Sequence, residues 1–204
     1  MSTLDPSKKY PQLKSICVFC GSSTGIHPEY AEVALATGKH LAENEITLVY
    51  GGGQLGLMGM VADGSLAAGG KVIGVIPEAL AVAEVAHARL TELIIVTTMH
   101  ERKAAMAKLS DGFLALPGGF GTFEEFCEII TWSQLDIHRK PCGLLNVRGY
   151  YDKLLGLFDH AATEGFLKER DRKRVLDSDN LEDLIARMDE SATNLEAPVY
   201  KWLD

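Results

Sequence analysis

Short apolar runs, each bounded by turn-forming residues, recur along the 204-residue chain. Most of these runs are continuous rather than alternating, which is typical of parallel strands covered on both faces. They read SICVFCG, ITLVYGG, KVIGVIP, LIIVT, GFLALPGG and PCGLLNV, at residues 15–21, 46–52, 71–77, 93–97, 112–119 and 141–147. Each run therefore predicts one strand of a parallel sheet.

Helical patterns fill the segments between these strands. They span residues 29–43, 57–68, 99–109, 123–137 and 150–163. The stretch SDNLEDLIARMDES adds a terminal helix, with Asp179 or Asn180 as its cap. Alternation of strand and helix predicts an α/β fold with one doubly wound, mostly parallel, Rossmann-like sheet and helices on both faces. Because no linker or repeat divides the chain, we expect a flexible segment over 1–13 and a single domain over 14–204.

Composition and charge narrow the range of functions. Hydrophobic residues make up 47% of the chain and charged residues 24%, as in ordinary globular proteins. The net charge of −8 argues against broad binding to nucleic acid or to a membrane surface, which needs a basic face. The first residues show no apolar signal core, and no stretch is long enough to span a bilayer, so we expect a cytoplasmic protein.

Cys17 and Cys20 form a C-x-x-C pair, which would suit a redox site or half of a zinc site. Residues three apart on a strand point to opposite faces, and no second C-x-x-C follows, so we expect packing thiols instead. The histidines show no ligand spacing, and we expect neither a metal nor a cofactor. His100, which lies inside a motif described below, is open to either a packing or a functional interpretation.

Residues 51–56, GGGQLG, satisfy G-x-G-x-x-G between a strand and a helix, and Glu78 stands where a ribose-binding acid would be. This pattern alone would favour a dinucleotide-dependent oxidoreductase. However, it follows the second strand rather than the first, and the chain leaves no room for a separate substrate domain. Glycines of this kind also serve any tight turn from strand to helix, which is the interpretation we prefer.

The helix at residues 99–109 begins with two cations in an unfavourable place. Thr98 and Glu101 match a capping box, so Arg102 and Lys103 lie close to the first turn. The partial positive charge of a helix N-terminus disfavours each cation by roughly 0.3–1 kcal/mol. The two side chains either reach solvent, pair with a nearby acid, or meet an anionic ligand. We favour the ligand, because the preceding strand leads this helix to the ligand edge of the sheet.

The stretch LPGGFGTFEE, residues 116–125, combines a glycine loop with a second Thr-x-x-Glu pattern. A capping box of Thr122 and Glu125 would explain those two residues but not Gly118, Gly119 and Gly121. Glycines let a ligand approach the backbone, and free N–H groups at a helix start bind anions. The segment can therefore hold a phosphate and present the carboxylate of Glu125 beside it, close to Arg102.

These segments resemble the LOG (Lonely Guy) family, the cytokinin riboside 5′-monophosphate phosphoribohydrolases. Residues 117–125 match its P-G-G-x-G-T-x-x-E motif, and residues 99–103, MHERK, match its M-x-x-R-K motif. The stretches GSS, YGGGQLGLMG and TWSQLDIHRKPCGLLNVRGYY are also similar in order and spacing, so the resemblance covers roughly residues 14–190. One departure is Phe120, where many relatives have Tyr.

The resemblance implies hydrolysis of the N-glycosidic bond of an adenosine 5′-monophosphate, plain or N6-substituted. The products would be ribose 5-phosphate and a free base, either adenine or a cytokinin. Arg102 and Glu125 take the catalytic positions. The positions that contact substrate are Glu84, Lys103, Gly118, Gly119, Phe120, Gly121, Thr122 and Thr131.

Breaking this bond develops positive charge on the ribose. The carboxylate of Glu125 suits either stabilisation of that charge or activation of the attacking water. The guanidinium of Arg102 suits either the phosphate or the leaving base. The sequence leaves both alternatives open.

Two other functions compete with the hydrolase. Relatives of the family were formerly labelled lysine decarboxylases, but that chemistry needs a lysine linked to pyridoxal phosphate. Lys103 is the only lysine in a motif, and no site is built around it. A non-catalytic carrier of a phosphorylated ligand, similar to molybdenum-cofactor carriers, would not need the pair of Arg102 and Glu125.

The helix after the glycine loop is apolar on more than one side. One stripe at helical spacing holds Phe123, Phe126, Cys127, Ile130 and Ile137. Ile129 and Trp132 lie off that stripe, so either a neighbouring helix of the same chain or a second subunit covers them. The resemblance to the family also implies a homodimer. A two-fold dimer is the commonest assembly, so we expect this chain to form one.

Overall fold

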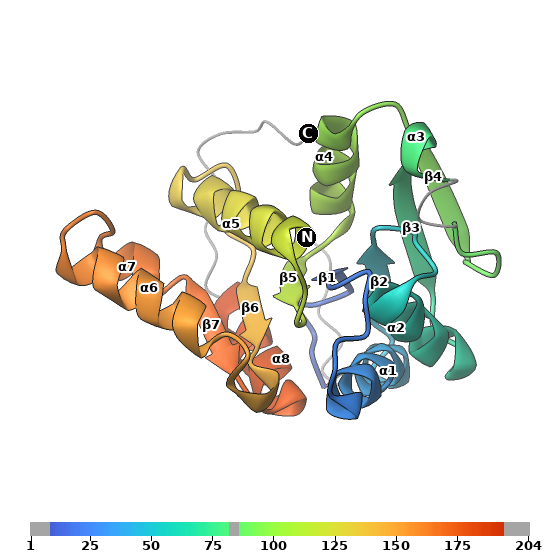
Figure 1. Cartoon of the computed structure of the whole chain (residues 1–204), viewed down its shortest axis with the longest axis horizontal. Coiled ribbons are helices and arrows are strands. Elements are labelled where there is room, and N and C mark those ends of the chain that lie inside the picture. The colour runs from blue at the N-terminus through green and yellow to red at the C-terminus, as the bar shows by residue number, and fades with distance from the viewer. Residues whose placement is uncertain (1–8, 82–85, 194–204) are drawn as a thin grey trace.

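A computed structural model describes residues 9–81 and 86–193, and a parallel sheet of seven strands forms its centre (Figure 1). The strands are β1 (Ser15–Phe19), β2 (Thr47–Tyr50), β3 (Val72–Pro77), β4 (Glu92–Val96), β5 (Gly112–Ala115), β6 (Cys142–Leu145) and β7 (Val175–Ser178). Their order is β4-β3-β2-β1-β5-β6-β7. The chain runs outward from β1 to β4, returns to β5 beside β1, and runs outward again to β7. This is the doubly wound α/β fold that the sequence predicts.

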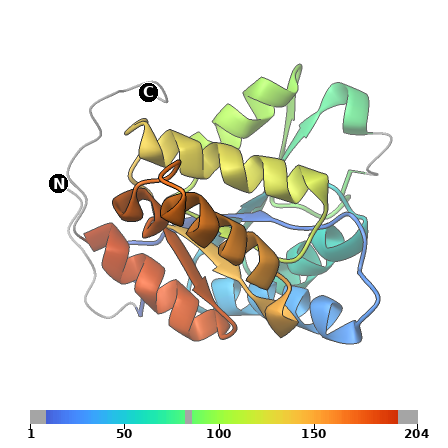
Figure 2. The same cartoon turned by 60° about the vertical axis from the view of Figure 1, so that its left-hand side comes forward.

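Helices cover both faces of the sheet. They are α1 (Pro28–Glu43), α2 (Gly56–Ala67), α3 (Glu78–Ala81), α4 (Met99–Leu109), α5 (Phe120–Gln134), α6 (Asp152–Thr163), α7 (Glu169–Arg172) and α8 (Leu181–Thr193), with a 3₁₀ turn, η1, at Val147–Gly149. Buried side chains of α1, α2 and α8 form one core cluster against the sheet. Buried side chains of α4, α5 and α6 form a second cluster on the opposite face of the sheet. Figure 2 shows α5 and α6 running across this face.

Alternation along β1 distributes the central side chains between the two clusters. Ile16 and Val18 join the cluster of α1 and α2, whereas Cys17 and Phe19 join the cluster of α4 and α5. Cys20 follows the strand and lies in the first cluster, while Cys17 lies in the second. Both thiols are free and buried, so the prediction of packing thiols is confirmed.

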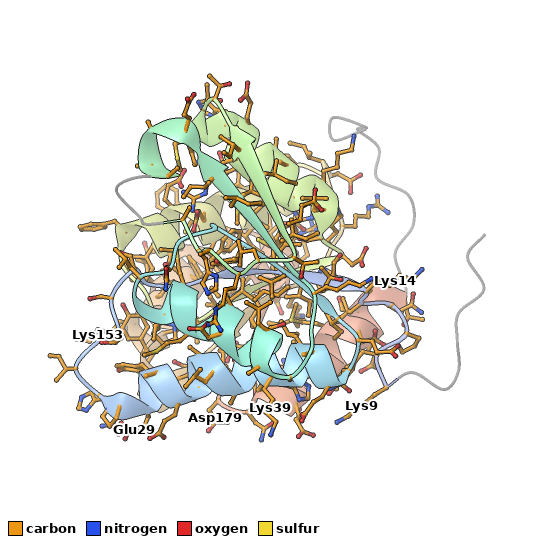
Figure 3. All side chains as sticks on the ribbon, turned by 90° about the vertical axis from the view of Figure 1, so that its right-hand side faces the viewer. Lys9, Lys14, Glu29, Lys39, Lys153 and Asp179 are labelled. Atoms are coloured by element: carbon orange, nitrogen blue, oxygen red, sulfur yellow. The ribbon has the colours of Figure 1, made fainter. Side chains whose placement is uncertain are left out.

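Helices α1 and α2 pack along each other on the first face, as Figure 3 shows from the side. The charged residues Glu29 and Lys39 of α1 lie at the outer edge of this pair (Figure 3). Close packing requires Gly38, because a Cβ there would lie 2.0 Å from the backbone oxygen of Val61 on α2. No helix in the described ranges is long and apolar enough to cross a bilayer.

Part of the segment predicted to be flexible is packed on the domain. The side chains of Tyr10 and Leu13 are buried and belong to the first cluster. The backbone N–H groups of Gln12 and Leu13 donate to Oδ1 of Asp189 on α8, at 2.8 and 3.2 Å. Residues 1–8 and 194–204 lie outside the described residues, so the domain limits as a whole stay a prediction.

Helix α5 begins and faces the sheet differently from the sequence prediction. It starts at Phe120 rather than at residue 123 and ends at Gln134. Its buried face is formed by Thr122, Phe126, Ile129 and Ser133. The placing of Ile129 off the core stripe is therefore wrong, because Ile129 follows Phe126 by three residues and shares its face of the helix.

Candidate active site

Three loops meet at the carboxyl ends of β1, β2 and β5, where the direction of winding reverses. The N–H of Gly21, after β1, donates to the carbonyl of Pro117, after β5, at 3.1 Å. The N–H of Leu57, at the start of α2, donates to the carbonyl of Gly21 at 3.0 Å. Open α/β sheets bind ligands at this kind of switch point. These three loops, which contain the GSS, GGGQLG and PGGFG stretches, therefore lie together at the edge of the sheet where ligands bind in such folds.

A cavity of about 280 Å³ opens among these loops. Its walls are Cys20, Gly21, Ser22, Met58, Leu80, Met99, Arg102, Gly119, Phe120, Gly121, Thr122, Glu124 and Glu125. A second cavity of about 280 Å³ adjoins it and shares Gly21, Ser22 and Gly119. Larger cavities of about 350 and 380 Å³ lie near the amino ends of β2 and β6, on the edge of the sheet that such folds do not use for ligands.

The start of α4 is fixed by the predicted capping box. The hydroxyl of Thr98 accepts from the N–H of Glu101 at 3.1 Å, and Oε2 of Glu101 accepts from the N–H of Thr98 at 3.2 Å. This confirms the cap at Thr98 and the start of the helix at Met99. The capping box thus sets the position of Arg102 one turn into the helix.

Arg102 does not reach solvent, since only 4% of its surface is exposed. Its Nη2 donates to the carbonyl of Gly51 at 3.2 Å, and its Nη1 lies 3.8 Å from the sulfur of Met99. A Cβ on Gly51 would lie 2.1 Å from Nη2. The first glycine of the GGGQLG stretch therefore makes room for the guanidinium.

The remaining glycines of that stretch also have a structural explanation. Gly52 and Gly56 have φ values of 79° and 58°, which favour glycine. A Cβ on Gly56 would lie 2.2 Å from the backbone of Ser22. The interpretation of this stretch as a tight turn from strand to helix is consistent with these positions.

Lys103 pairs with acids instead of entering the cavity. Its Nζ lies 2.6 Å from Oε1 of Glu124 and 2.8 Å from Oε2 of Glu128, both on α5. Burial opposes the charge, but the two carboxylates outweigh it and raise the pKa of Lys103. The side chain therefore stays protonated and ties α4 to α5. Its predicted contact with substrate stays a prediction.

The first turn of α5 forms one wall of the cavity. Gly119 is the N-cap and makes no side-chain cap bond, so the predicted capping box of Thr122 and Glu125 is wrong. The reason is the earlier start of the helix, which places Thr122 inside the first turn, where it is buried. The N–H groups of the first turn have no acceptor within the helix. Since Phe120, Gly121 and Thr122 line the cavity, they are suited to bind an anion there.

Two of the loop glycines are not explained by packing. A Cβ on Gly118 would lie 2.1 Å from Oγ1 of Thr122, so that position needs glycine. A Cβ on Gly119 or Gly121 would meet nothing within 4 Å. The protein therefore leaves open space beside both residues, as a ligand that approaches the backbone would require.

Glu125 lies half-buried on the same cavity as Arg102. Burial first, and the charge of Glu125 second, raise the pKa of the Cys20 thiol. The same two causes raise the pKa of Cys17, and Arg102 acts on it in the opposite direction. Cys20 lines the cavity but stays a thiol, so it is not a nucleophile of the thiolate type.

The other predicted site residues are placed less centrally. The hydroxyl of Thr131 donates to the carbonyl of Cys127 at 2.7 Å within α5, and Thr131 does not line the cavity. Phe120 is 92% exposed at the cavity wall. Glu84 lies outside the described residues. His100 is exposed and is not one of the lining residues.

Several lining residues escaped the sequence analysis. Cys20, Met58 and Leu80 come from a strand end and from two helices, so only the tertiary structure brings them together. Leu80 lies on the four-residue helix α3, which is too short to produce a periodic pattern. Within the ranges that the structure describes, no three His, Cys, Asp or Glu side chains gather in a group that could hold a metal ion.

The doubly wound sheet, with the glycine loop and Arg102 at its switch point, defines a Rossmann-like α/β protein. Residues 58–188 match a family model described as "Possible lysine decarboxylase". The chain is 50% identical over 189 residues to the probable cytokinin riboside 5′-monophosphate phosphoribohydrolase LOGL1 of Oryza sativa subsp. japonica, covering 92% of this chain and 85% of the relative. It is also 50% identical over 177 residues to the cytokinin riboside 5′-monophosphate phosphoribohydrolase of Rhodococcoides fascians, covering 86% and 89%. The chain belongs to the LOG family.

Solved structures with the same fold are more distant in sequence. The Moco carrier protein of Chlamydomonas reinhardtii superposes with a TM-score of 0.66 at 22% identity, covering 89% of this chain and 98% of that one. The molybdenum cofactor binding protein of Rippkaea orientalis gives 0.63 at 18% identity, covering 86% and 94%. These likenesses establish the fold alone.

The contact between Gly51 and Arg102 yields a direct test of the site. We expect Gly51→Ala to weaken binding of ribose 5-phosphate, the expected product, at least tenfold, about 1.4 kcal/mol, because the new methyl group displaces the guanidinium. Gly156→Ala on α6, where a Cβ would meet nothing, is the matched control and should bind as the unaltered protein does. Calorimetric dissociation constants decide the matter. Equal constants for both variants would show that the position of Arg102 has no influence on the ligand.

Proposed function

We propose that the protein hydrolyses the N-glycosidic bond of an adenosine-type nucleoside 5′-monophosphate. The products are a free base and ribose 5-phosphate. One observation carries this proposal: Arg102 and Glu125 line the same cavity as the first turn of α5. The names of relatives at about 50% identity, cytokinin riboside 5′-monophosphate phosphoribohydrolases, support it.

The cavity offers separate environments for the two ends of such a substrate. The phosphate binds at the start of α5, where unpaired N–H groups and the helix dipole favour an anion. The ribose lies toward Glu125. As the bond between C1′ and the base nitrogen breaks, its electron pair leaves with the base, and positive charge develops on the ribose. Water then supplies the oxygen that bonds to C1′; one of its O–H bonds breaks, and the base nitrogen ends with a proton in place of its bond to C1′.

Glu125 serves this step either by stabilising the positive ribose or by taking the proton of the attacking water. Arg102 serves it either by holding the phosphate or by supporting the departing base. The guanidinium is held in place by the carbonyl of Gly51, so it is already oriented before the substrate arrives. Fixed charges of this kind act without reorganisation during the reaction.

The lysine decarboxylase alternative does not fit the one lysine in a motif. Formation of a Schiff base needs a neutral amine. Lys103 has a raised pKa and is paired with Glu124 and Glu128, so it is held as an ammonium ion. A carrier that binds a phosphorylated ligand without reaction is the second candidate; the Moco carrier protein shares the fold, which by itself does not separate the two functions.

A substrate panel separates the hydrolase from the carrier. We expect release of free base from AMP and from N6-isopentenyl AMP, followed by liquid chromatography. Adenosine should react with a kcat/KM at least tenfold lower, because it lacks the group that the start of α5 binds. Binding of AMP without base release would establish the carrier. Equal turnover of AMP and adenosine would contradict the phosphate site.

A single substitution tests the role of Glu125. Glu125→Gln keeps the size of the side chain and removes its charge, so we expect at least a hundredfold loss of kcat, about 2.7 kcal/mol, without loss of fold. Base release and the melting temperature are measured on the same preparation. Activity within tenfold of the original value would show that the carboxylate takes no part in the chemistry.

We further propose that the protein is a homodimer. Phe123, Ile130 and Trp132 are partly buried against the chain's own second cluster, which accounts for part of the apolar surface of α5. Phe120 and Leu135 at its two ends stay 92% and 55% exposed, and a second subunit would cover them. Light scattering should give twice the mass of the chain, and Trp132→Glu should lower both the mass and the activity. Because Trp132 also packs on the chain's own core, Leu135→Glu at the exposed end of α5 should have the same effect. Full activity at the mass of one chain would refute the dimer.

The cytoplasmic location stays a prediction.

A further inference from the structure

Three successive carbonyl groups of the glycine loop accept hydrogen bonds from donors outside the loop. The carbonyl of Leu116 accepts from the hydroxyl of Tyr151 at 2.6 Å. The carbonyl of Pro117 accepts from the N–H of Gly21 at 3.1 Å. The carbonyl of Gly118 accepts a short hydrogen bond from the hydroxyl of Tyr150. The backbone that leads into α5 is therefore held from outside at each step.

The last of these bonds controls a peptide plane between two glycines. In a trans peptide, the carbonyl of Gly118 and the N–H of Gly119 point in opposite directions. The N–H of Gly119 therefore points away from the Tyr150 hydroxyl. Gly119 lines the cavity with Arg102 and Glu125, whereas Tyr150 lines only the adjoining cavity.

We propose that Tyr150 is a positioning residue, whose hydroxyl turns the Gly119 N–H toward the substrate phosphate. The inference rests on the proposed function, because the phosphate is that of the proposed substrate. Glycine populates regions of backbone space that other residues avoid, so the plane between Gly118 and Gly119 rotates easily when nothing holds it. A rotated plane would present a carbonyl oxygen to the phosphate, and the two would repel each other. The Tyr150 hydroxyl disfavours that rotated state.

The ring of Tyr150 is held before any ligand binds. It packs edge to face against Tyr30 and Tyr151, with ring centroids 5.9 and 5.1 Å apart, and it stacks on Phe123 at 6.4 Å. Tyr150 is 37% exposed, so removing its hydroxyl leaves water to satisfy the Gly118 carbonyl. Tyr150→Phe should therefore keep the fold. Tyr151 is unsuitable for the same test, because it is buried and its loss would leave the Leu116 carbonyl without a donor.

Tyr30→Phe is the matched control. Tyr30 lines the same adjoining cavity, and no hydrogen bond of its hydroxyl occurs among the residues that the structure describes. We expect Tyr150→Phe to raise KM for AMP about fivefold and to change kcat less than twofold. A fivefold change corresponds to about 1 kcal/mol. Turnover of adenosine, which has no phosphate, should be unchanged in both variants, and Tyr30→Phe should match the original protein throughout.

Binding of ribose 5-phosphate, measured by calorimetry, gives a readout that needs no turnover. Tyr150→Phe should weaken it about fivefold and Tyr30→Phe should not. If the original protein fails to hydrolyse AMP but shows this difference, the proposed function falls and the positioning role stands. If AMP is hydrolysed and Tyr150→Phe binds ribose 5-phosphate normally, the positioning role is overturned. Equal losses for AMP and adenosine would also overturn it, since they would show a general structural effect.

Discussion

The burial of one positive charge, the guanidinium of Arg102, constrains the whole ligand edge of the sheet. A buried charge is costly unless hydrogen bonds and opposite charges compensate it. The carbonyl of Gly51 supplies one such bond, and it can do so only because residue 51 has no side chain. The capping box of Thr98 and Glu101 then sets the turn of α4 from which the arginine enters the cavity. Two segments, the loop after β2 and the start of α4, thus fix the position of the guanidinium.

The same arrangement brings positive and negative groups together on one cavity of an acidic protein. The chain carries a net charge of −8, yet the start of α5 and Arg102 face one cavity. The neighbouring cation, Lys103, is drawn away and neutralised by Glu124 and Glu128. Glu125 places a carboxylate beside the positive groups. In the proposed function, separate parts of this small cavity serve an anionic phosphate and a ribose that becomes positive.

Much of this arrangement follows from the sequence, and the exceptions have physical causes. Strands β1, β2, β3, β5 and β6 are predicted because they are largely buried and so form continuous apolar runs. The edge strand β4 is predicted as well, because its sequence ELIIV is apolar although Leu93 and Ile95 are exposed. The edge strand β7, VLDS, is only partly buried, so its composition gives no such signal. The start of α4 is predicted because its cap is made by side chains. The start of α5 is not, because its N-cap is a glycine and the Thr-x-x-Glu pattern three residues later imitates a cap. The motifs identified Arg102 and Glu125, whereas the orientation of the loop by Tyr150 depends on contacts between distant segments.

In the proposed function, one cavity holds the phosphate of the substrate at the start of α5 and its ribose beside Glu125. A crystal structure of the Glu125→Gln variant with AMP tests it most directly, since we expect this variant to bind the nucleotide and to turn it over at least a hundredfold more slowly. We expect the phosphate oxygens to lie about 2.7–3.2 Å from the backbone nitrogens of the first turn of α5, with C1′ next to residue 125. A phosphate bound away from that turn, or a ribose remote from residue 125, would contradict it.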